Sequence, residues 1–304
     1  MPVALSSIRD LLLPGLRAVT GKYPQIPRKW DKIFQQGKSE MALERTVSMR
    51  YLPLAQLKSE GGPTTFDNLS GQRYTYNQEH IEIALGYAIT RKAIDDNLYK
   101  AQFGPSNLGL MESFAQTQEI YGAAVLNTAT TYDTSVGGDG VALLSTAHPI
   151  DTQNIANTSS VAQDLNEASL LNVQVQVSST YRDNAGLLVH AQARKMVVPP
   201  ALEPTTIRLT KTELRPGTAM NDVNAILTTA GGIPEGYVVN PFLTSQYAWF
   251  VLTDRPGLLY LERKPYEMDM QVDFTTDNLL TKAYQRYSFS YNDWRAIWGE
   301  TPSS

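Results

Sequence analysis

The sequence predicts an α+β protein with two lobes and two extensions, and three observations indicate this fold class. The chain has 304 residues, more than the roughly 250 to 300 at which a single hydrophobic core stops growing. Apolar residues alternate at period two in some stretches and recur every three or four residues in others, as strands and helices require. A Pro-interrupted N-terminus and a long turn-rich segment fit neither pattern.

Composition favours contact with other subunits and excludes several kinds of site. Only 18% of the residues are charged, against about 25% in an average soluble protein. A net charge of -4 excludes a basic nucleic-acid-binding domain, because neutralising phosphates needs clustered Lys and Arg. The absence of Cys excludes disulfides and thiolate metal sites. No apolar stretch reaches the roughly 18 residues of a membrane span, so no membrane contact is expected.

Residues 1–44 are predicted to form an arm that lies on another surface. Four prolines in its first 27 residues prevent one long helix. Trp30 and Phe34 are side chains of the type that is usually buried, yet the arm has no core of its own. We therefore expect both to contact a neighbouring subunit, the alternative being an ordinary flexible N-terminus.

Residues 45–88 predict a long β-hairpin. Apolar residues alternate on both sides of a turn-rich segment around Thr65, and the alternation shifts by one residue near Tyr51 and again near Glu79. A fold about Thr65 places Leu54 opposite Tyr76 and Met49 opposite Ile81. Arms of about 13 residues would reach on the order of 40 Å.

A two-stranded ribbon of that length is marginally stable alone in water, so its apolar side chains need a cover. A neighbouring subunit is the expected cover, and packing on the ribbon's own domain is the alternative. The predicted contact residues are Leu54, Leu57, Phe66, Tyr74 and Tyr76.

Two helices follow in the chain. The first is predicted over residues 106–130, with Pro105 and Ser106 as its start signal and a Gly-rich stop after Tyr132. The second is predicted over residues 164–182, with Asp164 as its N-cap. Its apolar stripe consists of Leu170, Val173, Val177 and Tyr181.

The second half of the chain predicts several short strands and one more helix. The helix covers residues 201–211, directly after Pro199 and Pro200. Residues rich in Val, Ile, Leu and aromatic side chains predict the strands. These strands cover residues 195–198, 237–239, 249–252, 257–261 and 282–290.

The sequence predicts no catalytic, cofactor-binding or metal-ligating residue. The segment from Gly15 to Tyr23 has five residues between its glycines, where a phosphate loop has four, and Tyr23 replaces the required Ser or Thr. His80, His148 and His190 are not in metal-ligand spacing. The chain is therefore not expected to be an enzyme.

Four phrases, taken together, resemble a known family. They are GVALLSTAHP at residues 140–149, ARKMVVPPALE at 193–203, LTDRPGL at 252–258 and KAYQRYSFSYNDWR at 282–295. In this order they resemble the major capsid proteins of tailed bacteriophages, and especially the Mu-type major head subunits. The resemblance runs from about residue 45 to the end of the chain.

The resemblance implies the Hong Kong 97-type capsid fold. Residues 1–44 would be the N-terminal arm and residues 45–88 the extended E-loop hairpin. The peripheral domain would comprise residues 89–150 and 262–288, with its spine helix at about 106–130. The axial domain would comprise residues 151–261 and 289–304.

The function implied is that of a major capsid protein. Pentamers and hexamers of the chain would form an icosahedral head that encloses double-stranded DNA without binding it sequence-specifically. Expected partners are a separate scaffolding protein, a portal and, in some particles, a decoration protein. The location would be the virion capsid, assembled in the bacterial host cytoplasm. The alternatives are an encapsulin-like cargo compartment shell and a hydrolase without a recognisable motif.

Overall fold

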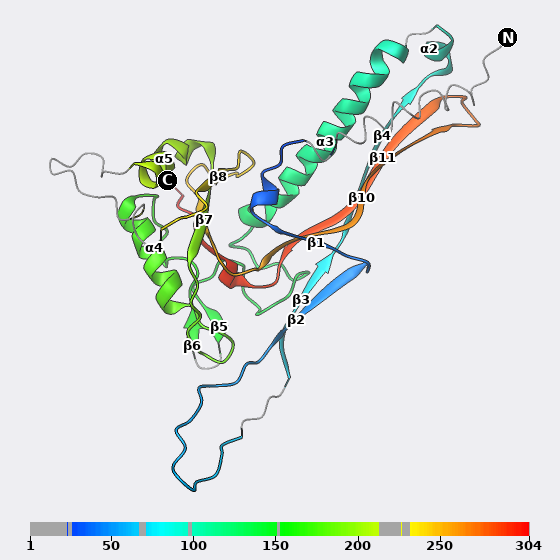
Figure 1. Ribbon diagram of the computed structural model, residues 1–304. Coiled ribbons are helices and arrows are strands. Elements are labelled where there is room, and N and C mark those ends of the chain that lie inside the picture. Colours follow the sequence, from blue (N-terminus) through cyan, green and yellow to red (C-terminus); the bar gives the residue numbers. More distant parts are fainter. Residues whose placement is uncertain are drawn as a thin grey trace.

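The computed structural model describes residues 23, 26–66, 71–96, 99–150, 153–212, 226 and 232–303. Two four-stranded sheets form the two lobes, and a β-hairpin projects from the junction between them (Figure 1). The predicted α+β class is confirmed. No helix in these residues is long and apolar enough to cross a membrane.

The first sheet is long and has the order β1-β10-β11-β4. Its central strands pair antiparallel, and the turn between them spans residues 273–278. The helix α3 lies along this sheet in Figure 1. The bounds are β1 Gln35–Lys38, β4 Ile81–Ile89, β10 Leu258–Val272, β11 Leu279–Tyr291 and α3 Tyr99–Asn127, and the short helix α2, Arg91–Asp95, precedes α3.

The second sheet has the order β12-β9-β7-β8 and belongs to the other lobe. Every residue of its central strand β9 is buried, as expected for a strand covered on both faces. The bounds are β7 Ala193–Val198, β8 Tyr237–Val239, β9 Trp249–Thr253 and β12 Ile297–Glu300. The same lobe contains β5 His148–Ile150, β6 Gln153–Ile155, α4 Glu167–Thr180 and α5 Glu203–Lys211.

The predicted elements of this lobe are confirmed, with later starts for α4 and for α5, which a 3₁₀ turn at Pro200–Leu202 precedes. Leu170, Val173, Val177 and Tyr181 are each buried, so the predicted stripe faces the core. The helix begins later than expected, because Asn166 rather than Asp164 is the N-cap. Its side chain accepts from the Ser169 amide, and Ser169 Oγ accepts from the Asn166 amide, which completes a capping box.

The spine helix α3 begins at Tyr99, seven residues before the predicted start. Pro105 lies inside the helix rather than at its start. A proline removes one backbone hydrogen bond and usually ends a helix. Here the helical turns on its N-terminal side continue, so this start signal was misleading.

The predicted hairpin register is wrong. Strands β2, Leu43–Met49, and β3, Gln72–Glu79, pair so that Val47 lies opposite Thr75 and Met49 opposite Gln72. Ile81 and Ile83 belong to β4, which pairs with β11 in the first sheet. The shift near Glu79 therefore marks a boundary between two strands and not a bulge in one ribbon. Period-two alternation is the same for both pairings and cannot distinguish them.

The N-terminal segment from Trp30 onward belongs to the subunit's own core. A single 3₁₀ turn, Trp30–Lys32, leads into β1, which pairs in parallel with β10. The Trp30 ring lies 4.1 Å from the Tyr260 ring and 5.4 Å from the Phe289 ring, measured between centroids. Phe34 packs edge-on against Phe289 at 5.0 Å. Sequence patterns could not show these contacts, because the partners are more than 200 residues away in the chain.

Candidate interaction surface on the projecting hairpin

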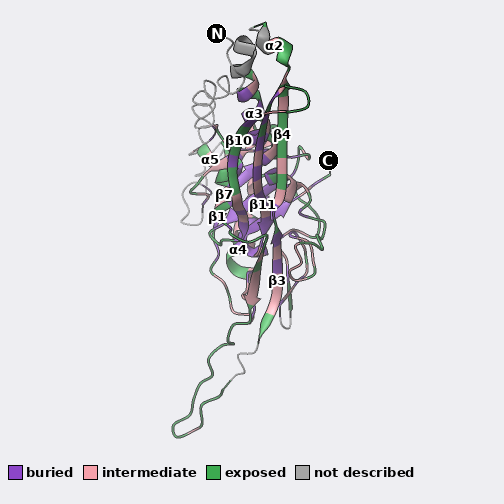
Figure 2. Cartoon of the chain, turned by 90° about the vertical axis from the view of Figure 1, so that its right-hand side faces the viewer, coloured by how far each residue is buried: buried purple, intermediate pink, exposed green. Residues whose placement is uncertain are grey.

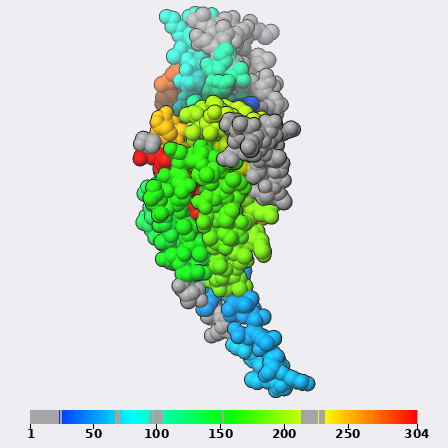
Figure 3. Space-filling model, turned by 90° about the vertical axis from the view of Figure 1, so that its left-hand side faces the viewer, coloured from blue at the N-terminus to red at the C-terminus, as the bar shows by residue number. Residues whose placement is uncertain are grey.

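The outer part of the hairpin, residues 50–66, stands clear of both lobes. Beyond the pair Met49–Gln72 the two strands no longer pair, and Figures 2 and 3 show this segment extending away from the body. Pro53 and Pro63 cannot donate to a ladder, and Gly61 has a positive φ of 72° in the turn. The local sequence therefore ends the ribbon early and leaves an open loop.

This outer segment exposes large apolar side chains. Leu54 is 71% exposed, Leu57 102% and Phe66 91%. Fully burying one such side chain stabilises a contact by about 1.5 to 3 kcal/mol. Several of them on one projecting segment indicate a surface that another protein covers.

The other four predicted contact residues lie differently. Tyr74 is half-buried, while Trp30, Phe34 and Tyr76 are 2%, 3% and 3% exposed. Trp30 and Phe34 were expected in a subunit contact because the N-terminal arm has no core of its own. Both side chains are instead buried against the long sheet of the same subunit. Tyr76 packs on Tyr291 at 6.1 Å between centroids, and burial raises its pKa. The structure thus brings together only Leu54, Leu57 and Phe66 on the exposed loop.

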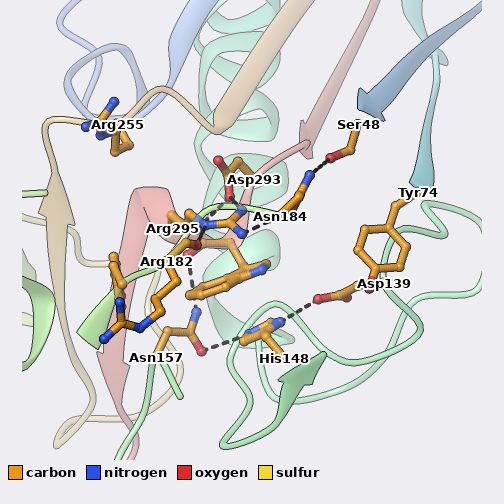
Figure 4. Close-up of polar contacts among 12 residues, drawn as sticks. Ser48, Tyr74, Asp139, His148, Asn157, Arg182, Asn184, Arg255, Asp293 and Arg295 are labelled. Atoms are coloured by element: carbon orange, nitrogen blue, oxygen red, sulfur yellow. Dashed lines mark hydrogen bonds and ion pairs between the residues drawn. The ribbon is translucent and has the colours of Figure 1, made fainter. Parts of the chain in front are cut away.

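Polar contacts hold the base of the hairpin, and Figure 4 shows the one between Ser48 and Asn184. The Asn184 side-chain amide donates to Ser48 Oγ at 2.6 Å and to the Met49 carbonyl at 2.9 Å. From the other strand, Arg73 donates to the Asn184 carbonyl, and the Tyr74 hydroxyl donates to the Pro149 carbonyl at 2.8 Å. The last paired residues of β2 and the first of β3 are therefore attached to the second lobe.

Arg295 holds Asn184 in place. Its Nη2 donates to Asn184 Oδ1 at 3.1 Å, its Nη1 pairs with Asp293 at 3.0 Å, and its Nε donates to the Arg182 carbonyl at 2.5 Å. The guanidinium also lies 4.5 Å from the centre of the Trp294 ring. A planar group with five donors can satisfy all these partners at once, which an ammonium cannot. Sequence reasoning missed this residue, because Arg182 and Asn184 are more than a hundred residues away in the chain.

The buried His148 directly precedes Pro149, whose carbonyl accepts the hydrogen bond from Tyr74. His148 stacks on Trp294 with centroids 4.2 Å apart, and its ring nitrogens contact Asp139 Oδ2 at 2.7 Å and Asn157 Oδ1 at 3.1 Å. The Asn157 amide donates in turn to the Leu143 carbonyl at 2.8 Å. Both ring nitrogens therefore have hydrogen-bond partners within the subunit.

The remaining polar contacts concern candidate metal ligands and the buried carboxylates of the described residues. Among them, no group of three or more His, Asp or Glu could hold a metal ion. The buried carboxylate Glu119 accepts hydrogen bonds from the amides of Lys29 and Trp30, which joins the N-terminal segment to α3. Burial raises the pKa of Glu119.

Comparisons with known proteins agree with this arrangement. A family model described as phage capsid protein matches residues 81–298. No curated protein matches the chain. Among solved structures, the procapsid of bacteriophage JBD30 matches with a TM-score of 0.55 and 13% identity, over 99% of this chain and 77% of that one.

Two further solved structures have the same fold. One from Microbacterium phage Oxtober96 matches at a TM-score of 0.51 and 12% identity, over 91% of each chain. A virus-like particle from Pyrococcus furiosus matches at 0.53 and 9% identity, over 94% of this chain and 98% of that one. The family model spans most of the chain and describes phage capsid proteins. It therefore favours a phage head protein over a cargo compartment shell or a hydrolase. The chain belongs to the phage capsid protein family and has the Hong Kong 97-type fold of a major capsid protein.

Proposed function

We propose that this capsid protein assembles into pentamers and hexamers that form an icosahedral head around double-stranded DNA. The observation that carries the proposal is the projecting hairpin, whose outer loop exposes Leu54, Leu57 and Phe66 while its base is fastened to the body. A firmly held base orients the loop, so less conformational entropy is lost when the loop binds a neighbour.

The domain roles follow from the two lobes. The lobe with α3 and the long sheet would be the peripheral domain, expected at residues 89–150 and 262–288, and the other lobe the axial domain, expected at residues 151–261 and 289–304. The elements of the two lobes differ from these bounds, because β10 and β11 bring residues 258–261 and 289–291 into the long sheet, while β5 at residues 148–150 lies in the second lobe. The E-loop, expected at residues 45–88, would be the hairpin of β2 and β3, since β4 pairs in the long sheet. Residues 1–44 would be the arm. The surface is short of charge, which suits burial on several sides by neighbours.

Other components complete the proposed particle. A separate scaffolding protein would direct assembly, a portal would occupy one vertex, and decoration proteins would bind the outside in some particles. The subunits would assemble in the cytoplasm of the bacterial host and remain in the virion capsid.

Shortening the hairpin tests the proposal. Residues 50–71 are replaced by Asn-Gly, a two-residue turn that connects Met49 to Gln72 in their observed register. Because the base contacts remain, the variant should fold as a subunit with a cooperative unfolding transition. It should form no closed shells in electron micrographs of the purified protein.

The matched control changes polar residues of the same loop. Gln56→Ala and Ser59→Ala should leave shells intact, since neither removes apolar surface. Closed shells of normal size from the shortened variant would contradict the proposal.

A further inference from the structure

The hydrogen bonds of His148 determine how many protons its ring carries (Figure 4). The side chains of His148 and Asp139 are 1% and 5% exposed, so both are shielded from solvent. Nδ1 lies 2.7 Å from Asp139 Oδ2, and Nε2 lies 3.1 Å from Asn157 Oδ1. A neutral imidazole donates from one nitrogen and accepts at the other. The partners of the two nitrogens therefore decide between the neutral and the doubly protonated ring.

The orientation of the Asn157 side chain is fixed by its other contacts. Its Oδ1 accepts from the Ser145 amide at 2.8 Å, and its Nδ2 donates to the Leu143 carbonyl at 2.8 Å. Two further carbonyls, those of Trp294 and Ile297, accept from the same nitrogen at 3.3 and 3.4 Å. A flipped amide would place its oxygen against three carbonyls and its nitrogen against a donor. The ring nitrogen Nε2 therefore faces an acceptor and must donate.

The other ring nitrogen, Nδ1, also faces an acceptor. An ionised carboxylate such as that of Asp139 can only accept, and a buried carboxylate without a partner is costly. One proton between Nδ1 and Oδ2 satisfies both groups, and the imidazole, as the stronger base, holds it. The pair is then an imidazolium beside a carboxylate.

The stacked ring of Trp294 also favours a positive charge on His148. The two rings lie 8° from parallel with centroids 4.2 Å apart, and the face of an indole attracts a cation. Arg295 contacts the same indole at 4.5 Å, and Asp293 at 3.0 Å balances its charge. The Asp139 carboxylate is then the partner that balances the charge of the imidazolium.

The nearby tyrosines add no charge to this pair. Burial raises the pKa of Tyr76, of Tyr181 and of Tyr291, the last to about 12. Asp133 is exposed to solvent, where salt screens its charge. The proton count of the site is therefore set by the histidine and the carboxylate that contact each other.

We propose that His148 carries two ring protons in the folded subunit and that the second proton makes the base of the hairpin sensitive to pH. The imidazolium joins the Gly-rich loop after α3 to β5. The Pro149 carbonyl beside it accepts from Tyr74 of β3, and on the loop the Gly138 amide donates to the Thr75 carbonyl at 2.9 Å. Without the proton, Nδ1 and the buried carboxylate would be two acceptors facing each other, so both attachments of β3 would weaken.

A proton that only the folded subunit binds makes stability fall as the pH rises. An ordinary histidine titrates near pH 6.5, so the unfolded chain has lost this proton at pH 7.5 while the folded subunit retains it. The equilibrium constant for unfolding should therefore increase by up to about tenfold per pH unit until the folded ring also loses its proton. His80 does not contribute above pH 7.5, because its lowered pKa leaves it neutral in both states.

Nitrogen NMR of the histidines tests the proton count directly. The chain has three histidines, His80, His148 and His190, and the signals lost in His148→Gln belong to His148. In the wild-type subunit labelled with ¹⁵N-histidine, both ring nitrogens of His148 should carry a proton at pH 7.5. One unprotonated nitrogen in that ring at pH 7.5 would overturn the proposal.

Asp139→Asn removes the charge that holds the second proton, and the new amide can donate to a neutral ring. His148 should then have one unprotonated nitrogen at pH 7.5, and urea unfolding should show a smaller loss of stability between pH 7.5 and 9.5 than in the wild type. The matched control Asp133→Asn, on the same loop and exposed, should behave as the wild type. Two ring protons in Asp139→Asn, or a pH dependence equal to that of the wild type, would contradict the assignment. If this variant does not fold, the wild-type spectrum decides.

Hydrogen exchange measures the effect on the hairpin itself. Amides of β3, corrected for the intrinsic rate, should lose more protection between pH 7.5 and 9.5 than those of β11, and the difference should be smaller in Asp139→Asn. Equal changes in the two strands would show that the proton does not hold the hairpin base. All three measurements use the unassembled subunit, so their outcomes are independent of whether the chain forms shells.

Discussion

Arg295 shows how one side chain connects segments that are remote in the sequence. It is 8% exposed and contacts Asp293, Arg182 and Asn184. A buried charge is stabilising only when its partners satisfy it, and removing one member leaves the others desolvated and unpaired. The base of the hairpin therefore depends on a residue near the C-terminus.

Arg295→Met should lower the free energy of unfolding by about 3 kcal/mol, because the Arg182 carbonyl and Asn184 Oδ1 lose their guanidinium donors and Asp293 loses its ion pair. Arg295→Lys should lower the free energy of unfolding by a smaller amount. The ammonium keeps the charge but cannot donate to all three partners of the planar guanidinium at once. Urea unfolding of the purified subunit measures both. The control Arg208→Met, on the exposed face of α5, should change stability by no more than about 0.5 kcal/mol. An equal loss in both Met variants would contradict the role given to Arg295.

His80 is the second residue whose surroundings have a measurable consequence. It lies between β3 and β4, and its Nε2 contacts Ser39 Oγ at 2.8 Å. Burial, with a smaller effect from the Arg286 charge, lowers its pKa below the ordinary 6.5. The folded protein therefore binds a proton on His80 less readily than the unfolded chain does.

The unfolded chain takes up this proton first as the pH falls below about 6.5. The stabilisation that the neutral ring contributes is present above that pH and is lost as the pH falls towards the lowered pKa. Urea midpoints at pH 7.5 and 5.5 should therefore differ more for the wild type than for His80→Gln. His190→Gln, at an exposed position, should retain the wild-type difference. A wild-type pH dependence in His80→Gln would refute this assignment.

At the scale of elements, local signals set the ends of helices where a cap is present. The capping box of Asn166 and Ser169 satisfies amides at the start of α4. Below it, Leu170, Val173 and Val177 are buried in the core of the second lobe. In α3, by contrast, Pro105 did not end the helix, so a start signal alone does not define a helix.

Asn166→Ala should cost about 1 kcal/mol, because the amide of Ser169 loses its acceptor. Asn172 lies on the exposed side of the same helix, where Asn172→Ala should be neutral or slightly stabilising, since Ala has the higher helix propensity. Thermal unfolding of the two variants compares them directly. A larger loss for Asn172→Ala would show that the cap does not stabilise α4.

At the scale of the whole molecule, the charge balance bears on how the shell would hold DNA. The chain has 26 Lys plus Arg against 30 Asp plus Glu. Each phosphate contact releases counterions and strengthens binding, so a chain with more acidic than basic residues binds DNA weakly. A container gains from this, because a strongly basic wall would retain the genome.

Unassembled subunits should accordingly bind double-stranded DNA no more tightly than about 10⁻⁶ M near physiological salt and without sequence preference. Fluorescence anisotropy with two unrelated duplexes of equal length measures both properties. A tight complex with only one of the duplexes would mean that the chain recognises DNA, which its composition argues against.

The sequence by itself determined the α+β class, the strands and helices of the second lobe, the long spine helix and the existence of a hairpin. Each follows from periodicity, because one face of every element must be apolar to join a core. It also predicted Leu54, Leu57 and Phe66 as contact residues, since large apolar residues in a Pro- and Gly-rich loop have no local partner, and the structure shows these side chains exposed. The resemblance to phage capsid proteins was likewise found from the sequence alone.

Only the tertiary structure decided which strands pair and which apolar residues stay exposed. Period-two alternation is unchanged when the pairing of two strands shifts by an even number of residues. It therefore could not show that Ile81 and Ile83 pair with β11 and not with the other arm of the hairpin. The burial of Trp30 and Phe34, and the contacts of Arg295 with Arg182 and Asn184, join residues separated by more than a hundred positions. Such contacts arise from the packing of the whole chain, and no local pattern records them.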